Sequence, residues 1–446
     1  MNGPLPPTIW IEVDDIIEYF TRHDQPTGIQ RVVFELLNAA RQRSRQAVRL
    51  CRLNRRSGRF EALDLTGYDA MLTWLRREGR VYQKYGRLHA RLGIWARDLY
   101  RLRHWRDPGR KLSARHDARA ETFFREIQTG AVILSLGGPW LNPRFPSAVR
   151  ALKSRPGVRF VQLVHDIIPI SHADLLDARA IPQFVTWLHE TAPLVDFYLT
   201  PSRHVAGELQ SYAAAQGWPR RSITVIRFGS GFAPAAPVGQ EPLPCPVGEP
   251  YALCVGTVDL RKNTELLVQI WERLVAKHGR DRVPLLVLAG HRGYRSQAVF
   301  TRLQATGFVQ GRVRFLERVS NAALEDLYRR AAFTVFPSKA EGWGLPVEES
   351  FVYGRPAIVS TATSLPEVGS DLAEYFDPAD AEGAYARIER AITDPAHLDR
   401  LAERIRKDFR PRSWNETFDQ IAEVIGRECA LLERGRHDAA ERGTGT

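Results

Sequence analysis

The stretch Phe336–Ser360, FPSKAEGWGLPVEESFVYGRPAIVS, has the pattern of a strand, a loop, a helix and a second strand. Residues 332–336 form a short apolar and aromatic run, which is typical of a buried parallel strand. Pro346 suits the first helical position, and Gly354 followed by Pro356 ends the helix. A loop that follows a parallel strand and opens a helix is a common phosphate site, because free N–H groups and the positive helix end face it.

Two glutamates mark this stretch, Glu341 in the loop and Glu349 in the helix, with seven residues between them. Ionised carboxylates accept strong hydrogen bonds from hydroxyl groups, so the pair suits a sugar and a ribose. An alternative is that Glu348 and Glu349 only stabilise the helix dipole. The complete string, with its glycines and flanking strands, is more specific than the two glutamates alone.

The string EGWGLPVEES, residues 341–350, resembles the E-x7-E signature of the retaining glycosyltransferases of family 4. The resemblance implies that Glu341 contacts the donor sugar during catalysis and that Glu349 holds the ribose of the nucleotide. It also implies that backbone N–H groups of Gly344 and Leu345 face the diphosphate. The donor-binding residues expected in this stretch are Gly342, Trp343, Gly344, Leu345 and Glu349.

The fold that the resemblance implies is the α/β fold called GT-B, in which two Rossmann-like domains face each other across a cleft. Residues 233–250 carry six prolines, which exclude a helix or a central strand and favour a linker between domains. The expected parts are an acceptor domain (1–232, with a basic helical insertion at about 76–125), the linker (233–250), a nucleotide-sugar domain (251–413), a helix crossing back to the first domain (414–434) and a disordered tail (435–446).

Two loops of the first domain contribute site candidates. Gly28 precedes a predicted helix and would let a ligand approach the backbone, although a glycine before a helix is common. The resemblance places Gly28 at the donor phosphates and Gln30 near donor or acceptor. His165 and Asp166 follow the predicted strand 158–163, and the resemblance places His165 near the anomeric carbon with Asp166 beside it at the donor. The alternative for this pair is a hydrogen bond that only fixes a turn.

The second domain opens with the strand Tyr251–Val255 and the string GTVDLRKN, residues 256–263. Arg261 can bind a diphosphate through paired N–H donors, and Lys262 can bind it as a point charge. The string resembles the corresponding loop of the family, but Thr257 stands where many relatives have an arginine. Further donor residues implied by the resemblance are Gly256, Thr257, Arg318 and Val319, the last two bordering the nucleotide base.

Residues 76–119 hold fourteen Lys or Arg against four Asp or Glu. Apolar side chains recur there at helical spacing, which predicts a basic amphipathic helix. Such a helix suits an anionic membrane or acceptor surface, and the alternative is that its apolar face packs onto the first domain. The residues of this face are Tyr85, Leu88, Leu92, Trp95, Leu99 and Leu102.

Composition narrows the remaining possibilities. The net charge of +12 suggests an anionic partner, but no nucleic-acid motif accompanies it. The four cysteines have no paired spacing, and the amino terminus has no signal-peptide pattern, so a cytoplasmic protein, peripheral at the inner membrane face, is expected. The chain has no Asp-x-Asp motif, so neither a metal nor another cofactor is indicated.

The sequence therefore predicts a retaining glycosyltransferase that uses a nucleotide diphosphate sugar, with mannose or rhamnose as the guessed sugar. The acceptor would be a glycan or lipid-linked oligosaccharide in surface polysaccharide synthesis, such as capsule or O-antigen. One alternative is a nucleotide-sugar epimerase on the same fold. The other is a non-catalytic basic protein that binds nucleic acid or acts as a scaffold, against which the intact Glu341, Glu349 and Lys262 argue.

Overall fold

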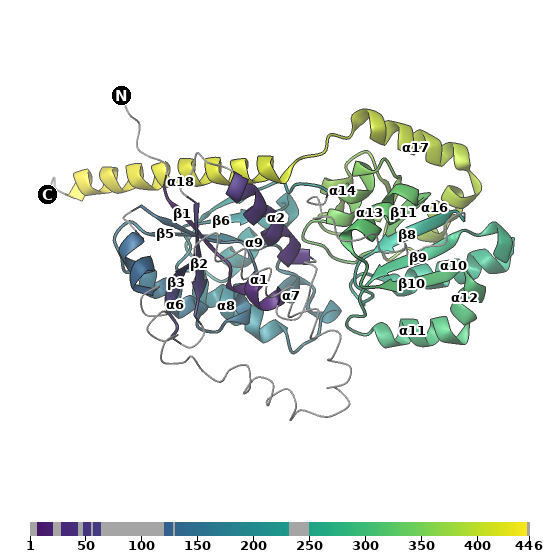
Figure 1. Cartoon of the computed structure of the whole chain (residues 1–446), viewed down its shortest axis with the longest axis horizontal. Helices are drawn as coiled ribbons and strands as arrows, with labels where there is room; N and C mark the ends of the chain where they lie inside the picture. The colour runs from purple at the N-terminus through teal and green to yellow at the C-terminus, as the bar shows by residue number, and fades with distance from the viewer. Residues whose placement is uncertain are drawn as a thin grey trace.

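The computed structural model describes residues 7–20, 28–42, 48–54, 57–63, 120–127, 130–231 and 249–443. These residues form two α/β units that lie side by side, each built around one sheet (Figure 1). The predicted helical face from Tyr85 to Leu102 and most of the proposed linker lie outside the described residues. No helix in the described part is both long enough and apolar enough to cross a membrane.

The amino-terminal sheet has the strand order β3-β2-β1-β4-β5-β6-β7. All neighbours are parallel except β3, an edge strand antiparallel to β2 that the sequence did not predict. The strand order reverses between β1 and β4, which makes this pair the topological switch point of the sheet. Its strands are β1 (Ile9–Glu12), β2 (Val48–Leu53), β3 (Phe60–Leu63), β4 (Val132–Ser135), β5 (Arg159–Leu163), β6 (Phe197–Thr200) and β7 (Ser222–Val225).

Helices cover both faces of this sheet. One face packs on α1, α2 and the last helix of the chain, and the opposite face packs on α6 and α8. The helices of the unit are α1 (Asp14–Phe20), α2 (Gly28–Gln42), α6 (Phe145–Lys153), α7 (Ile168–Ser171), α8 (Ile181–Thr191) and α9 (Arg203–Ala215), with short 3-10 turns η1 (Pro139–Leu141) and η2 (Ala173–Leu175).

The carboxyl-terminal sheet is parallel throughout and has the order β10-β9-β8-β11-β12-β13, with its switch point between β8 and β11. Its strands are β8 (Tyr251–Val255), β9 (Leu285–Gly290), β10 (Val313–Glu317), β11 (Phe333–Phe336), β12 (Ala357–Ser360) and β13 (Glu374–Phe376). Its helices are α10 (Thr264–His278), α11 (Ser296–Ala305), α12 (Gly307–Gly311), α13 (Asn321–Arg330), α14 (Leu345–Val352), α15 (Leu365–Gly369), α16 (Ala381–Thr393) and α17 (Pro395–Asp408), with the 3-10 turn η3 (Arg280–Arg282).

The last helix, α18 (Trp414–Gly443), leaves the carboxyl-terminal unit and runs along the amino-terminal one (Figure 1). Trp414, Phe418, Ile421 and Ile425 are buried in the same core as β1 and α2. The helix continues to Gly443, past Gly435, the residue from which the sequence predicted a disordered tail. Gly435 costs a helix only about 1 kcal/mol, and the alanines, arginines and glutamate that follow favour continuation.

Candidate active site

The centre of the candidate site is the carboxylate of Glu341, at the switch point of the carboxyl-terminal sheet. The loop after β8 supplies Arg261 and Lys262, and the loop after β11 supplies Glu341. Arg261 Nη1 donates to Glu341 Oε2 at 2.7 Å, and Lys262 Nζ donates to Glu341 Oε1 at 2.5 Å. The loops after β8 and β11 were both expected to contact the donor sugar nucleotide. The carboxylate of Glu341 joins them.

The charge state of Glu341 follows from these contacts. Burial alone would raise the pKa of its carboxyl group, but the cations of Arg261 and Lys262 outweigh burial and lower this pKa to about 2. Thr363 and Ser364 hold the backbone of Glu341 with 2.8 Å hydrogen bonds from their hydroxyls to its carbonyl oxygen. Glu341 is thus a fixed, ionised hydrogen-bond acceptor at any physiological pH.

His165 and Asp166 meet this centre from the amino-terminal unit. A Cβ atom on Gly342 would lie 2.1 Å from the carbonyl oxygen of His165, so only glycine allows the two loops to approach so closely. Burial raises the pKa of Asp166, whose charge also interacts with Arg261 and Glu341. The structure therefore brings together His165, Asp166, Arg261, Lys262, Glu341 and Gly342.

The ring of His165 faces the amino-terminal unit. Its Nε2 atom lies 2.7 Å from the carbonyl oxygen of Leu136, so Nε2 carries the proton and donates it. Burial lowers the pKa of His165 to about 4, and the Leu136 carbonyl only partly opposes this shift. At neutral pH the imidazole is therefore uncharged.

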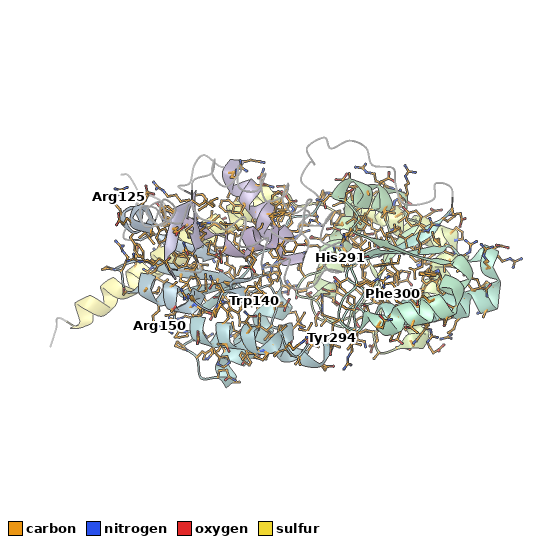
Figure 2. The ribbon with its side chains drawn as sticks, turned by 60° about the horizontal axis from the view of Figure 1, so that its bottom comes forward. Arg125, Trp140, Arg150, His291, Tyr294 and Phe300 are labelled. Carbon is orange, nitrogen blue, oxygen red and sulfur yellow. The ribbon has the colours of Figure 1, made fainter. Side chains whose placement is uncertain are left out.

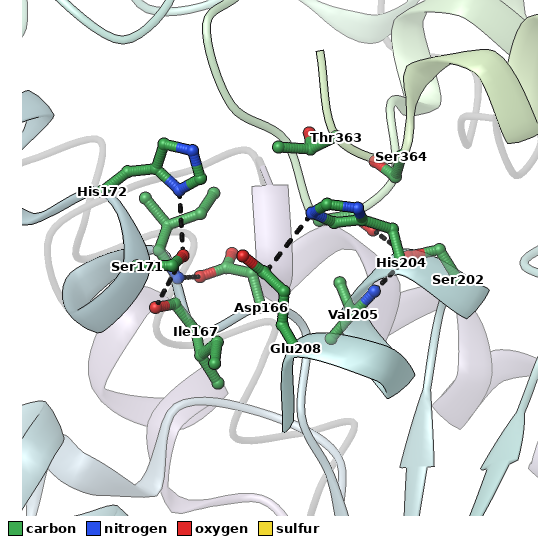
Figure 3. Close-up of polar contacts among 12 residues, drawn as sticks. Asp166, Ile167, Ser171, His172, Ser202, His204, Val205, Glu208, Thr363 and Ser364 are labelled. Carbon is green, nitrogen blue, oxygen red and sulfur yellow. Dashed lines mark hydrogen bonds and ion pairs between the residues drawn. The ribbon is translucent and has the colours of Figure 1, made fainter. Parts of the chain in front are cut away.

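Figure 3 shows the surroundings of Asp166. Its Oδ1 atom accepts a 3.0 Å hydrogen bond from the backbone N–H of Ile168, and Glu208 lies close enough for its charge to raise the pKa of Asp166 further. The Nε2 atom of His204 lies 3.6 Å from the Oε2 atom of Glu208. In the view of Figure 3, Thr363 and Ser364 of the carboxyl-terminal unit lie above His204. Neither His204 nor Glu208 was identified from the sequence.

Glu349 is engaged by two other side chains. Arg31 from α2 pairs with its Oε1 atom, and the Tyr328 hydroxyl donates to Oε2 at 2.7 Å. Arg31 also donates to the carbonyl oxygen of Gly231 at 2.7 Å. The second glutamate of the signature is thus the anchor of a buried ion pair between the two units.

Further contacts hold the units together around these loops. The Glu367 carboxylate accepts hydrogen bonds from the backbone N–H groups of Arg203 (2.9 Å) and His204 (2.7 Å), at the start of α9 in the other unit. Ser202 donates to the carbonyl oxygen of Gly342 at 3.0 Å. The cavity beside Lys262 has a volume of about 10 Å³, which is room for one water molecule.

Comparison with known proteins shows the family to which this chain belongs. A family model described as glycosyl transferases group 1 matches residues 240–408. O-antigen chain mannosyltransferase B of Escherichia coli is 30% identical over 268 residues, which are 59% of this chain and 68% of that protein. The chain belongs to the group 1 glycosyl transferase family.

This glycosyltransferase also resembles more distant proteins. The serotype-specific mannosyltransferase WbdA of Escherichia coli is 25% identical over 284 residues, covering 60% of this chain but only 33% of WbdA. The solved structure of the Candida albicans trehalose-6-phosphate phosphatase N-terminal domain matches 95% of this chain and 98% of that one, with a TM-score of 0.56 at 14% identity. The predicted GT-B fold and family 4 membership are confirmed.

The other residues predicted to bind the donor lie at three places in the structure. Gly256 and Thr257 lie beside Lys262, around the small cavity. Gly28 and Gln30 lie at the start of α2, one turn or less from Arg31. Arg318 and Val319 follow β10, which β9 separates from the switch point.

The indole of Trp343 does not take part in the ion pairs of Glu341 and Glu349. Its Nε1 atom donates to Glu348 at 3.0 Å, and the ring packs against the core of the amino-terminal unit beside Phe228. Leu345 packs against the same core. These two side chains therefore form an apolar part of the contact between the units, while their backbone groups remain the candidates for donor binding.

Sequence reasoning missed Arg31, Tyr328 and Glu367. The position of Arg31 could have indicated a buried ion pair, because Arg31 lies on the buried face of α2 among apolar neighbours such as Val32 and Leu36. Glu35 is buried on the same helix. Buried charges are normally paired, so this position required an acid elsewhere. Nothing in the string around Tyr328 or Glu367 indicates their partners.

The low pKa of His165 makes a prediction about acid stability. The unfolded chain keeps the ordinary value of 6.5, so between about 6.5 and 4 it binds more protons than the folded chain. Stability therefore falls as the pH drops through this window, by about 2 kcal/mol between pH 7 and pH 5 from this group alone. We expect His165→Gln to remove this part of the fall, measured as urea midpoints at both pH values. Parallel pH curves for the two proteins would contradict the neutral, buried imidazole.

The contact of Gly342 with His165 makes a second prediction. Gly342→Ala places a Cβ atom against the backbone of His165, so the two loops must move apart. Because displacements of about 1 Å cost about 10²-fold in rate, we expect a loss of that order in kcat for sugar transfer. Gly426→Ala is the control, because a Cβ there meets nothing within 4 Å inside α18. This control should keep full activity, and equal activities of the two variants would show that the contact is dispensable.

Proposed function

We propose that this glycosyltransferase moves a sugar from a nucleotide diphosphate sugar to a glycan or lipid-linked oligosaccharide in surface polysaccharide synthesis, with retention of configuration. The observation that carries the proposal is the carboxylate of Glu341 held between Arg261 and Lys262 at a switch point. Mannose is the first candidate sugar because the two Escherichia coli relatives are named mannosyltransferases, and rhamnose is the second.

The charges of the site suit this reaction. The bond between the anomeric carbon and the diphosphate oxygen breaks, and its electron pair leaves with the diphosphate, whose charge Arg261 and Lys262 stabilise. The acceptor oxygen bonds to the same face of the anomeric carbon, and its proton passes to the departing phosphate oxygen. Glu341 stays ionised, since its pKa is about 2, and accepts hydrogen bonds from sugar hydroxyls.

Donor binding requires that the loops separate. Arg261 and Lys262 are bonded to Glu341, Glu349 is bonded to Arg31, and the cavity beside Lys262 holds about 10 Å³. A nucleotide diphosphate would therefore exchange some of these contacts for its own, and this exchange would require a movement of the loops. Closure over the bound donor would then exclude water from the reaction.

The place of action in this proposal is the inner face of the membrane. Support comes from the positive charge of residues 76–119, with fourteen Lys or Arg against four Asp or Glu. An anionic membrane attracts such a segment, and a lipid-linked acceptor would lie there.

The test compares nucleotides and products. Thermal shifts with GDP, UDP, dTDP and their sugars should show one nucleotide that stabilises the protein, and NMR of the product should show the anomeric configuration of the donor. Conversion of the donor alone into an epimer would support the epimerase instead. RNA binding with a steep salt dependence and no response to any nucleotide would overturn the proposal.

A further inference from the structure

The carboxyl-terminal unit contains a second hollow, for which the proposed function gives no role. It has a volume of about 370 Å³ and is open to the surface. Ligand pockets commonly have about 300–1,000 Å³, so this hollow has room for a small ligand. We call it the α10 groove. Its lining residues are Asn263, Glu265, Leu266 and Gln269 at the start of α10, Lys339 after β11, and Pro378 and Ala379 after β13.

The α10 groove shares two loops with the candidate active site. Asn263 directly follows Lys262, and Lys339 precedes Glu341 by two residues. The backbone N–H of Lys339 donates to the carbonyl oxygen of Arg261 at 2.8 Å, so a hydrogen bond joins the two loops. A ligand in the groove would therefore lie next to the loops that hold the ion pairs of Glu341.

The same two loops also reach the amino-terminal unit. Leu260 and Ala340 share an apolar cluster with Ile168 of that unit. The backbone N–H of Leu260 donates to the carbonyl oxygen of Tyr294 at 3.3 Å, and Figure 2 labels Tyr294 at the side of the carboxyl-terminal unit nearest the other unit. Because Lys339 directly precedes Ala340, the α10 groove lies beside the contact between the units.

Three polar side chains of the groove have no partner in the described part of the chain. The amides of Asn263 and Gln269 and the ammonium of Lys339 are half-buried, yet none makes a hydrogen bond or ion pair with another described residue. An asparagine before a helix normally accepts a hydrogen bond from the first turn. Asn263 has a left-handed backbone instead (φ 55°, ψ 33°), and its side chain makes no bond to α10. These three groups are therefore available to a ligand.

The chemistry of the lining suits an uncharged ligand with several hydroxyl groups. The two amides can both donate and accept hydrogen bonds, and the ammonium of Lys339 donates them. Leu266 and Pro378 add apolar surface, against which the C–H groups of a sugar ring can pack.

The charges around the groove disfavour a phosphate. Lys339 supplies a positive charge, but Glu265 lies in the first turn of α10, and Asp377 and Asp380 flank the two lining residues after β13. These carboxylates repel an anion that Lys339 would attract. Among the described residues, no group of three or more His, Cys, Asp or Glu side chains could hold a metal ion. A neutral saccharide avoids the repulsion.

We propose that the α10 groove is a saccharide subsite, in which Asn263, Gln269 and Lys339 bind an uncharged sugar unit. The choice of ligand rests on the proposed function. Two sources offer the same chemistry. One is a sugar unit of the glycan acceptor that is remote from its reacting end, and the other is a free saccharide that acts as an effector through the loop of Arg261.

Isothermal titration of the full-length protein with α-linked mannotetraose, without donor, tests the subsite. The groove variant combines Lys339→Met with Gln269→Leu. We expect its Kd for mannotetraose to be about tenfold higher than that of the wild type, as for the loss of two hydrogen bonds. The melting temperature should stay as in the wild type, because neither side chain has a partner to lose among the described residues.

Lys277→Met combined with Gln304→Leu is the matched control. Both side chains are exposed, on α10 and α11 of the same unit, and neither lines the groove. The control should bind mannotetraose as the wild type does. Equal Kd values for the groove variant and the wild type, no binding by the wild type, or tighter binding of inorganic phosphate than of mannotetraose would overturn the inference.

Transfer rates distinguish the two sources, with the nucleotide sugar chosen by the thermal-shift panel as donor. For a remote acceptor unit, KM of the wild type should be lower for mannotetraose than for methyl α-mannoside, and the groove variant should lose this difference. For an effector, free mannose should change kcat for mannotetraose in the wild type and not in the groove variant. Neither effect would overturn the inference. No response to any nucleotide would overturn the proposed function, while the titration with mannotetraose would still test the groove.

Discussion

Lys262→Met is expected to lower kcat for sugar transfer by about 10²–10³-fold, because a preorganised charge at a developing anion contributes about 3–4 kcal/mol. The Lys262 ammonium lies at the end of the loop after β8 and is bonded to Glu341 at 2.5 Å. Methionine keeps most of the length of the side chain and removes the charge that, in the proposed function, stabilises the leaving diphosphate. Steady-state rates with the nucleotide sugar chosen by the thermal-shift panel measure the effect.

Lys277→Met is the control for this substitution. Lys277 lies on α10 in the same unit, is 58% exposed, and pairs with Glu389 away from the site. An exposed pair contributes at most about 1 kcal/mol, so this variant should keep the wild-type rate. A similar rate for both variants would show that Lys262 does not serve the leaving group.

Arg31→Met is expected to destabilise the protein by about 3–5 kcal/mol, because it leaves Glu349 as a buried charge without its cation. Both side chains are almost fully buried, at 8% and 1% exposure. The loss should appear in calorimetry as a lower melting temperature, by several degrees.

The double variant Arg31→Met with Glu349→Gln tests the cause. It removes the unpaired charge as well, so most of the lost stability should return. Arg302→Met is the control, since Arg302 pairs with Glu272 on the surface and is 42% exposed. If Arg31→Met cost no more than Arg302→Met, the ion pair between the units would be without importance for stability.

The parts of the structure that the sequence predicted are those in which each segment carries its own signal. The strand, glycine loop and helix of residues 333–352 are encoded by adjacent apolar and turn residues, so the fold and the position of Glu341 could be predicted. Arg261 and Lys262 could be predicted because a strand end and a helix start flank them.

The parts that escaped prediction depend on contacts between distant segments. Arg31 and Glu349 are 318 positions apart, and Glu367 reaches the start of α9 across 163. No local pattern encodes such partners, because each needs the two units to be placed against one another first.

The path of α18 decides how this enzyme could be recombined with its relatives. The helix comes last in the chain, yet Trp414 and Phe418 complete a core of the amino-terminal unit. A hybrid made by joining one amino-terminal half to a foreign carboxyl-terminal half would therefore receive a final helix shaped for another core. To exchange the carboxyl-terminal unit, an engineer would have to transplant about residues 249–412 as an internal cassette and leave both ends of the host chain in place.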